Sequence, residues 1–301
     1  MTVISFHDRV AIVTGAGGGL GRTYALDLAA RGAQVVVNDL GGAKDGTGGD
    51  ASAARRVVEE IEAEGGSAVA SHDSVSTPEG GQAIVDAALH AFGRVDIVIN
   101  NAGILRDRTL AKLEPQDLEA VLAVHLKGAF YVSRPAFRVM RENGYGRFVF
   151  TSSNAGVFGN FGQSNYGAAK MGLVGLSNVL ALEGAKANIK SNVICPMART
   201  RMTEELLGPL ASSLDPECVT PMVVYLASEA CEYTHEVFSA GGNRYARMFI
   251  GLAPGWFAGK GSPVTAEDIA AHIDQIRDQK GYVVPGSALD EIAGLVAQLR
   301  G

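Results

Sequence analysis

Residues 10–22 read VAIVTGAGGGLGR, and this stretch decides the fold of the chain. Its first four residues are apolar and mostly β-branched, as in a strand that is buried in a parallel sheet. Glycines follow directly, and YALDLAARG at residues 24–32 then has helical spacing and a closing glycine. Strand, glycine turn and helix start form a phosphate cradle, because glycines let the backbone approach a pyrophosphate and the helix N-terminus offers unpaired N–H groups. The cradle residues expected to contact a cofactor are Gly15, Gly19, Leu20 and Gly21.

A second apolar run, QVVVN at residues 34–38, ends at Asp39. A carboxylate at the tip of the second strand can accept hydrogen bonds from both hydroxyls of an adenosine ribose, and it would repel a 2′-phosphate. No arginine directly follows Asp39 to receive such a phosphate. The sequence therefore predicts NAD rather than NADP as the cofactor.

Strands and helices alternate along residues 1–240. Further strands are predicted at SAVASHDS (67–74), VDIVINNAG (95–103), GRFVFTSS (146–153) and NIKSNVICP (188–196). Such alternation implies right-handed crossovers and an α/β fold, a Rossmann-type doubly wound parallel sheet of about seven strands with helices on both faces. Ligands of such sheets bind at the carboxyl ends of the strands. One crevice should therefore collect the residues at or just after the predicted strand ends, which are Gly15, Asp39, Asp73, Asn100, Ser153 and Pro196.

The stretch TSSNAGVFGNFGQSNYGAAK, residues 151–170, carries the chemistry. Tyr166 and Lys170 are four residues apart and lie one above the other on a helix face. A lysine ammonium beside a phenol favours the phenolate and lowers the phenol pKa, so Tyr166 becomes a general base or acid near neutrality. The same spacing also occurs by chance on amphipathic helices. Its weight here comes from the cradle, from Asp39 and from the preceding Ser153.

Composition fits a compact enzyme. The 301 residues are 47% hydrophobic and 19% charged, with no apolar run long enough to span a membrane and no secretory signal pattern. A net charge of −6 with scattered basic residues argues against nucleic acid as a partner. The odd set of three cysteines has neither disulfide nor metal spacing, which suits a reducing cytoplasm. We expect a protein that is cytoplasmic, binds no metal and acts on a small molecule.

Three motifs together resemble the short-chain dehydrogenase/reductase family: Thr14 to Gly21, Asn100-Asn101-Ala102-Gly103, and Ser153 with Tyr166-Gly-Ala-Ala-Lys170. This resemblance implies that Tyr166 exchanges a proton with the substrate, that Ser153 holds the substrate oxygen and that Lys170 binds the nicotinamide ribose. The residues implied around the rest of the NAD cofactor are Asp39 at the adenosine ribose, Asp73 and Ser74 at the adenine, Asn100, Asn101, Ala102 and Gly103 beneath the ribose, and Pro196.

Within the family, several short sequence segments resemble those of the (3R)-hydroxyacyl-CoA dehydrogenase units of peroxisomal multifunctional enzymes of type 2. They are VVVNDLGG, NNAGILRDR, VHLKGAF, GNFGQSNYGAAK and RMT. The resemblance implies oxidation of a (3R)-3-hydroxyacyl-CoA thioester to a 3-ketoacyl-CoA in fatty-acid β-oxidation, by a homo-oligomer, either a dimer or a tetramer. A 17β-hydroxysteroid dehydrogenase is the alternative enzyme, since a steroid alcohol needs the same chemistry. A regulator that binds the dinucleotide without catalysis is the third interpretation.

Two positions depart from the wider family. Many members have asparagine where this chain has His125, which either supports a proton relay to the lysine or is a structural histidine. Many members have Pro-Gly where this chain has Pro196-Met197. Arg199 and Arg201 follow, and they either face phosphates or lie solvated at the surface.

Residues 241–301 form an extension beyond the catalytic domain of residues 1–240. Thr265 to Asp268 and Ser287 to Asp290 have helix-capping patterns, each before an apolar-periodic run, so two helices are predicted. The resemblance places this extension near the substrate entrance or a dimer partner, and stability alone is the other possible role. Trp256 and Phe257 are candidate core anchors.

Overall fold

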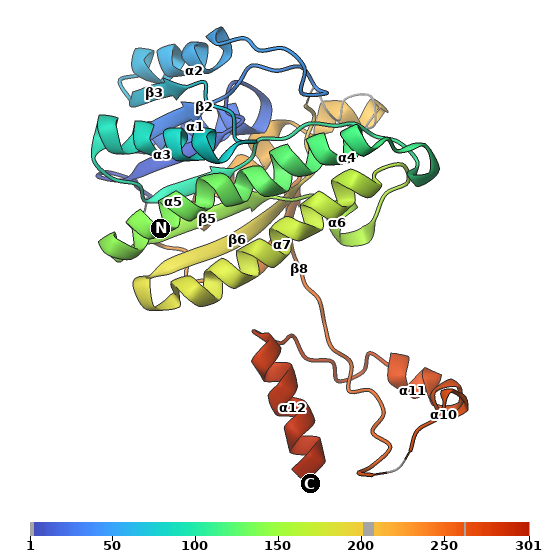
Figure 1. The fold of residues 1–301 in the computed structure, drawn as a ribbon. Coiled ribbons are helices and arrows are strands. Elements are labelled where there is room, and N and C mark those ends of the chain that lie inside the picture. Colours follow the sequence, from blue (N-terminus) through green and yellow to red (C-terminus); the bar gives the residue numbers. More distant parts are fainter. Residues whose placement is uncertain (1–2, 201–207, 262, 301) are drawn as a thin grey trace. The chain divides into compact units, whose positions relative to one another are not determined.

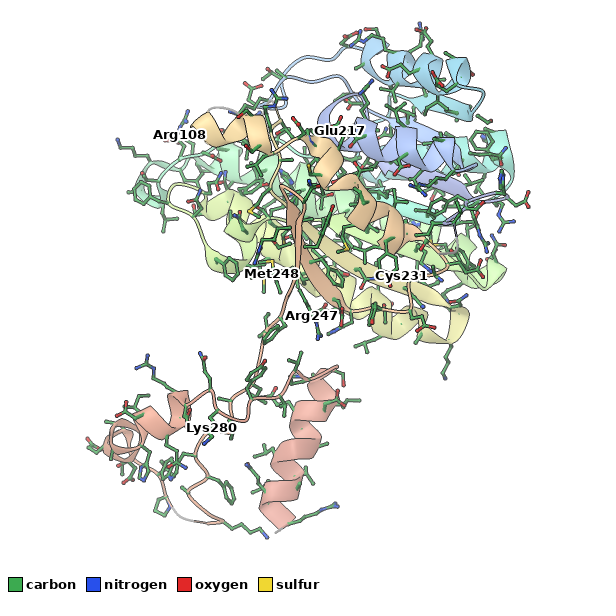
Figure 2. The ribbon with its side chains drawn as sticks, turned by 180° about the vertical axis from the view of Figure 1, so that it is seen from behind. Arg108, Glu217, Cys231, Arg247, Met248 and Lys280 are labelled. Carbon is green, nitrogen blue, oxygen red and sulfur yellow. The ribbon has the colours of Figure 1, made fainter. Side chains whose placement is uncertain are left out.

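The structure is a computed structural model that describes residues 3–200, 208–261 and 263–300. The chain forms two compact units, Met1–Arg247 and Met248–Gly301, and Figure 2 labels the two residues at which they divide. Arg201 and the word RMT, residues 201–203, lie outside the described residues.

An eight-stranded sheet forms the centre of the first unit, in the order β3-β2-β1-β4-β5-β6-β7-β8. Strands β3 through β7 pair in parallel, and the order reverses between β1 and β4. The predicted Rossmann-type doubly wound sheet is confirmed. The strands are β1 Val10–Thr14, β2 Gln34–Asn38, β3 Ser67–Ser71, β4 Ile97–Asn100, β5 Gly146–Thr151, β6 Ile189–Pro196, β7 Glu236–Gly241 and β8 Arg244–Met248.

The eighth strand was not visible in the sequence pattern. Gly242 and Asn243 join β7 to β8 with φ angles of 54° and 61°. A two-residue turn with both φ angles positive is the type I′ hairpin turn, so β8 runs antiparallel to β7. Because β8 is an edge strand with the polar sequence RYARM, it lacks the apolar run that marks the inner strands. The sheet therefore continues past residue 240.

Helices cover both faces of the sheet. Helices α3, α5 and α7 lie on the face toward the viewer in Figure 1, and α1, α2 and α9 lie on the opposite face, which Figure 2 shows from behind. The α-helices are α1 Gly19–Ala30, α2 Ser52–Ala63, α3 Pro78–Phe92, α4 Pro115–Leu122, α5 Gly128–Asn143, α6 Asn154–Phe158, α7 Ser164–Gly184 and α9 Thr220–Ala227. Short segments of 3₁₀- or π-helix are η1 Leu110–Lys112, η2 Ala123–Lys127, η3 Ala185–Ala187, η4 Gly208–Ser213 and η5 Pro216–Cys218.

The inner strands lie in the core, as their apolar runs predict. Every residue of β1, β4 and β5 is buried. Burying one large aliphatic side chain contributes about 1.5–3 kcal/mol, so this core dominates the stability of the unit. The third, fourth and fifth strands end earlier than the sequence suggested, and polar groups after β3 and β4 form other hydrogen bonds, Asp73 with the Ser71 hydroxyl and the Asn101 N–H with the Thr14 hydroxyl.

The second unit contains α10 Ala266–Ala271, α11 Ile273–Arg277 and α12 Ala288–Arg300. The predicted capping box is present, with Thr265 and Asp268 bonded to each other's backbone N–H groups. Ser287 accepts a hydrogen bond from the Asp290 N–H, as predicted for the last helix. The first predicted helix is divided at His272, whose ring stacks on Trp256 at 3.8 Å. The Phe257 side chain is 42% exposed, so the described residues do not bury it as the core anchor that was expected.

In the part of the chain that the structure describes, no helix combines the length and the apolar character that a membrane crossing requires.

Gly21 should be essential for stability. A Cβ at this position would meet the Gly15 carbonyl oxygen at 2.3 Å and Ala16 Cα at 2.9 Å, so helix α1 could not pack as closely on the end of β1. We expect Gly21→Ala to lower the free energy of unfolding by about 1–3 kcal/mol, measured by denaturant unfolding without cofactor. Gly18→Ala is the matched control, since Gly18 has an extended backbone with φ −176° and a Cβ there would meet no atom of the described residues within 4 Å. Equal losses for the two variants would contradict this account.

Candidate active site

The site begins where the strand order reverses, at the carboxyl ends of β1 and β4. The Thr14 hydroxyl donates to the Ile99 carbonyl and accepts from the N–H groups of Asn101 and Ala102, at 3.0 and 3.1 Å. The Asn101 amide returns two bonds, to the carbonyls of Thr14 and Gly15. In this topology the two loops diverge from the sheet and leave a crevice for a ligand.

The glycine cradle has an open helix terminus. Gly15 and Gly19 have φ angles of 64° and 53°, a conformation that side chains disfavour. Among the described residues, no side chain caps the N-terminus of α1, and no acidic residue lies in its first turn. Free N–H groups and the positive end of the helix dipole suit an anion. The cradle therefore fits the pyrophosphate of a dinucleotide.

Asp39 lies at the tip of β2 beside the cradle. Its carboxylate accepts from the Gly17 N–H at 2.7 Å and from the Gly41 N–H at 2.6 Å. These bonds hold the carboxylate at the edge of the cradle, where the sequence predicted a ribose-binding group.

The other predicted cofactor residues follow β3, β4 and β6. The Asp73 carboxylate accepts from the Ser71 hydroxyl at 3.0 Å, and the Ser74 and Ser76 hydroxyls lie 2.8 Å apart. Asn100 is buried and donates to the Ser133 hydroxyl at 3.0 Å, so its side-chain amide has a structural partner. Pro196 ends β6.

The structure brings the three predicted catalytic residues together. Ser153 is the N-cap of α6, where its hydroxyl accepts from the Ala155 N–H at 3.1 Å. The same hydroxyl donates to the Asn154 side-chain oxygen at 3.2 Å and lies close enough to the Tyr166 phenol to lower its pKa. Lys170 lies one turn along α7, with its ammonium nitrogen 5.5 Å from the Tyr166 ring centroid and 2.5 Å from the Thr151 carbonyl oxygen. Their catalytic roles remain a prediction, which this proximity supports.

Burial governs the protonation of this group. It raises the pKa of Tyr166 to about 12, although the hydrogen bond from Ser153 acts in the opposite direction. It also lowers the pKa of Lys170 to about 7. Both shifts have one cause, since removal from water penalises the phenolate and the ammonium alike. Burial therefore outweighs the lowering that the sequence predicted, and the effect of Lys170 on the phenol stays a prediction.

His125 lies beneath the tyrosine, in the π-helical turn η2. Its ring meets the Tyr166 ring edge-on at 5.2 Å, and its Nε2 lies 3.0 and 2.8 Å from the Ile104 nitrogen and oxygen. Burial, together with the charge of Lys170, lowers the pKa of His125 well below its usual value. The ring is therefore neutral, and it holds the loop after β4 in place.

That loop, residues 104–108, is fastened to the start of α7 by side chains that the sequence did not single out as site residues. Asn165 donates to the Arg106 carbonyl at 2.9 Å, and Gln163 donates to the Asp107 carboxylate at 2.7 Å. The signal that could have found them was the position of both amides within the three residues before Tyr166, in the segment GNFGQSN.

Two other candidates lie elsewhere. Arg199 is paired with Asp215 at 2.9 Å, and both side chains are about half exposed, as for a solvated surface arginine. Cys195 and Cys231 are buried, Cys218 is partly buried, and all three thiols are free. Within the described ranges, no group of three or more His, Cys, Asp or Glu side chains could hold a metal ion.

A family model described as short chain dehydrogenase matches residues 9–208. The chain belongs to the short-chain dehydrogenase family. It is therefore an oxidoreductase, and enzymes of this family typically use a nicotinamide dinucleotide. The resemblance inferred from the glycine cradle and the Ser-Tyr-Lys group is confirmed.

Several relatives cover nearly the whole of this short-chain dehydrogenase. A short-chain type dehydrogenase/reductase of Mycobacterium tuberculosis is 50% identical over 284 residues, which are 94% of this chain and 99% of that protein. Mouse peroxisomal multifunctional enzyme type 2 is 45% identical over 98% of this chain, which spans 40% of the mouse protein. The full-length Drosophila melanogaster multifunctional enzyme type 2 has a solved structure with a TM-score of 0.84 and 38% identity, and the match covers 99% of this chain and 50% of that chain.

The raised pKa of Tyr166 predicts a direction for the pH dependence. Alcohol oxidation needs the deprotonated phenol, and a group with a raised pKa stays protonated until higher pH. We expect kcat/KM for oxidation to rise with pH between about 7 and 10, whereas kcat/KM for ketone reduction does not rise, since reduction needs the protonated phenol. Initial rates in both directions measure this, and an oxidation rate that falls over the same range would contradict it.

Proposed function

We propose that the protein is an NAD-dependent dehydrogenase that interconverts (3R)-3-hydroxyacyl-CoA and 3-ketoacyl-CoA. The observation that carries the proposal is the Ser153–Tyr166 hydroxyl pair, with Lys170 packed against it at the same sheet edge as the cradle and Asp39. The choice of substrate is supported by the similarity to peroxisomal multifunctional enzyme type 2 across 98% of this chain.

Each residue has a definite role in the proposed reaction. Bound NAD⁺ supplies the hydride acceptor. Ser153 holds the substrate oxygen beside the phenol, and Tyr166 removes the hydroxyl proton of the secondary alcohol in the oxidation direction. Lys170 anchors the nicotinamide ribose and, when protonated, stabilises the phenolate. Holding the oxygen and the phenol in one orientation lowers the barrier by reducing the entropy lost in the reaction step.

The dry surroundings of the pair suit this chemistry. Lys170 is 3% exposed, and its ammonium has a carbonyl partner in Thr151. Lys170 is thereby shielded from water, whereas Tyr166 is partly buried and open to a substrate, and electrostatic interactions at such a site are stronger than in bulk solvent. The same burial makes the state of Tyr166 sensitive to whatever charge is placed beside it.

A substrate panel tests the proposal. Purified protein with NAD⁺ should oxidise (3R)-3-hydroxyacyl-CoA, with NADH formation followed by absorbance. Tyr166→Phe should lower kcat at least about a hundredfold and retain NADH binding, because the variant lacks only the proton-transfer hydroxyl. Tyr233→Phe, at a 55% exposed position before β7, is the matched control and should keep full activity.

The panel also decides between the alternatives. Turnover of 17β-hydroxysteroids without turnover of the acyl-CoA would replace the proposed substrate by the steroid. Dinucleotide binding without turnover of any alcohol would indicate the non-catalytic regulator. An active Tyr166→Phe variant would disprove the role assigned to the phenol.

Asp39 should set the preference for NAD. Its carboxylate would lie beside a 2′-phosphate and repel it, whereas it accepts hydrogen bonds from ribose hydroxyls. We expect Asp39→Asn to lower the NAD:NADP ratio of kcat/KM by at least about tenfold, the equivalent of one charge-assisted hydrogen bond. Glu59→Gln removes the same charge from the exposed surface of α2 and should leave the ratio unchanged. An unchanged ratio in Asp39→Asn would rule out this assignment.

A homo-oligomer is part of the proposal. Helices α5 and α7 lie side by side on one face of the sheet, and both have exposed apolar side chains. Phe130 is 48% exposed, Val179 50% and Leu182 53%. Exposed apolar residues on two neighbouring helices support an interface on this face. Light scattering should show a dimer or tetramer, and Val179→Asp with Leu182→Asp should shift it toward the monomer. A monomeric wild-type protein would exclude the assembly.

The extension of residues 241–301 and the cellular compartment stand as proposals too. We assign the chemistry to residues 1–240 and propose that a second copy of the chain covers apolar positions of the extension, such as Leu289 at 73% exposure. The cytoplasm is the proposed compartment, supported by three free thiols. The relatives named peroxisomal make the peroxisome the alternative, which imaging of the tagged protein would decide.

A further inference from the structure

A polar pocket of about 500 Å³ lies between two loops that the proposed mechanism leaves without a role. One is the glycine-rich loop after Asp39, and the other is the loop 104–108 after β4. Two bonds join them: the Leu105 N–H donates to the Lys44 carbonyl at 2.9 Å, and Arg106 Nε donates to the Asp45 carbonyl at 2.9 Å. The residues around the pocket are Lys44, Asp45, Thr47, Leu105, Arg106, Asp107, Arg108 and Asp117.

The wall of this pocket continues directly into the catalytic helix. Arg108 pairs with Gln163 in a parallel β-bridge, and Gln163 immediately precedes α7, which carries Tyr166. The carboxylate of Asp107, also on this wall, accepts from the Gln163 side chain at 2.7 Å. The pocket therefore lies at the rim of the crevice in which the alcohol would react.

The charged side chains around the pocket differ in their hydrogen-bond and ion-pair partners. Asp45 accepts two hydrogen bonds from Thr47, Asp107 accepts one from Gln163, and Asp117 is paired with Arg106 at 3.5 Å. Arg108 is exposed, and its Nη1 donates to the carbonyl of its neighbour Asp107 at 2.9 Å. Across the described residues, Arg108 has no carboxylate partner. A guanidinium has five N–H donors, so most of those of Arg108 remain available to an anion.

The proposed substrate has its anionic groups at the matching end. In an acyl-CoA, the pantetheine arm separates the reacting acyl chain from the diphosphate and the 3′-phosphate. With the 3-hydroxyl at Tyr166, these phosphates must lie outside the crevice, at its rim. Guanidinium groups bind phosphate through paired, charge-assisted hydrogen bonds. A steroid alcohol has no group that Arg108 would recognise.

We propose that Arg108, in the pocket beside Lys44 and Arg106, binds a phosphate of the CoA nucleotide and so selects thioesters of CoA over uncharged alcohols. This inference rests on the proposed function. The three basic and three acidic side chains around the pocket leave it without net charge. Selection of an anion therefore depends on where the Arg108 guanidinium lies and not on an overall positive charge.

Steady-state kinetics with three (3R)-3-hydroxyacyl thioesters test the inference, namely those of CoA, dephospho-CoA and pantetheine. Arg108→Gln should raise KM for the CoA thioester about tenfold, with kcat nearly unchanged, and should leave kcat/KM for the pantetheine thioester as in the wild type. If Arg108→Gln does not raise KM for the dephospho-CoA thioester, Arg108 contacts the 3′-phosphate. If KM rises for the dephospho-CoA thioester as well, Arg108 contacts the diphosphate.

Two controls keep the result specific. Arg141→Gln removes the same charge from an exposed position in the last turn of α5, at the opposite edge of the sheet, and should change no parameter. Arg108→Lys keeps the charge without the planar fork and should fall between the wild type and Arg108→Gln. KM for NAD⁺ should be the same in all variants, which separates a CoA phosphate from a cofactor phosphate.

The inference is overturned if Arg108→Gln affects all three thioesters equally, affects none of them, or raises KM for NAD⁺ instead. Failure of the proposed function has a different signature, because the wild-type protein would then turn over no thioester at all. That result would overturn the phosphate site together with the function on which it rests.

Discussion

The hydroxyl of Thr14 is the contact on which the arrangement of the site depends. It lies at the end of β1, donates to the Ile99 carbonyl near the end of strand β4 and accepts from the N–H groups of Asn101 and Ala102. Neighbouring strands diverge here because the sheet order reverses. A crevice at that position would expose unpaired backbone groups, and the Thr14 and Asn101 bonds satisfy them. The cradle and the loop 104–108 thereby start from fixed positions.

Burial gives the site its second property. The ammonium of Lys170 and the phenol of Tyr166 share an environment in which neither favours its charged form. A protein that only had to be stable would gain by replacing this pair with apolar groups. The pair is instead held by Thr151, Ser153 and the neutral ring of His125, with α6 and η2 supplying the backbone positions. Such a poised pair is typical of sites that transfer protons.

The loops on the cofactor and substrate sides are physically connected. Asp39 holds Gly17 and Gly41, the loop that follows Gly41 is bonded to residues 104–108, and these are bonded to the start of α7. Hydrogen bonds therefore connect the Asp39 carboxylate, the two loops and the helix that carries Tyr166. The loops proposed to bind the dinucleotide and the substrate thus form one continuous hydrogen-bonded set.

Much of the fold could be predicted because parallel strands bury both faces and leave unbroken apolar runs, as in VAIV and QVVVN. The glycine cradle was predicted because glycines directly follow an apolar strand run and open a helical pattern, and the positive φ angles of Gly15 and Gly19 are conformations that glycine favours. Strand β8 was missed because a polar edge strand has no such run, and the amides of Gln163 and Asn165 were not singled out because their partners lie far away in the chain.

The sequence by itself determined that Tyr166 and Lys170 share a helix face, since that follows from a four-residue spacing. Only the tertiary structure decided their protonation. The pKa of Tyr166 is raised rather than lowered, because desolvation depends on the segments that fold over the helix, and the chain brings these together from β4, β5 and η2. Spacing is a local property of the sequence, whereas burial is a property of the whole fold.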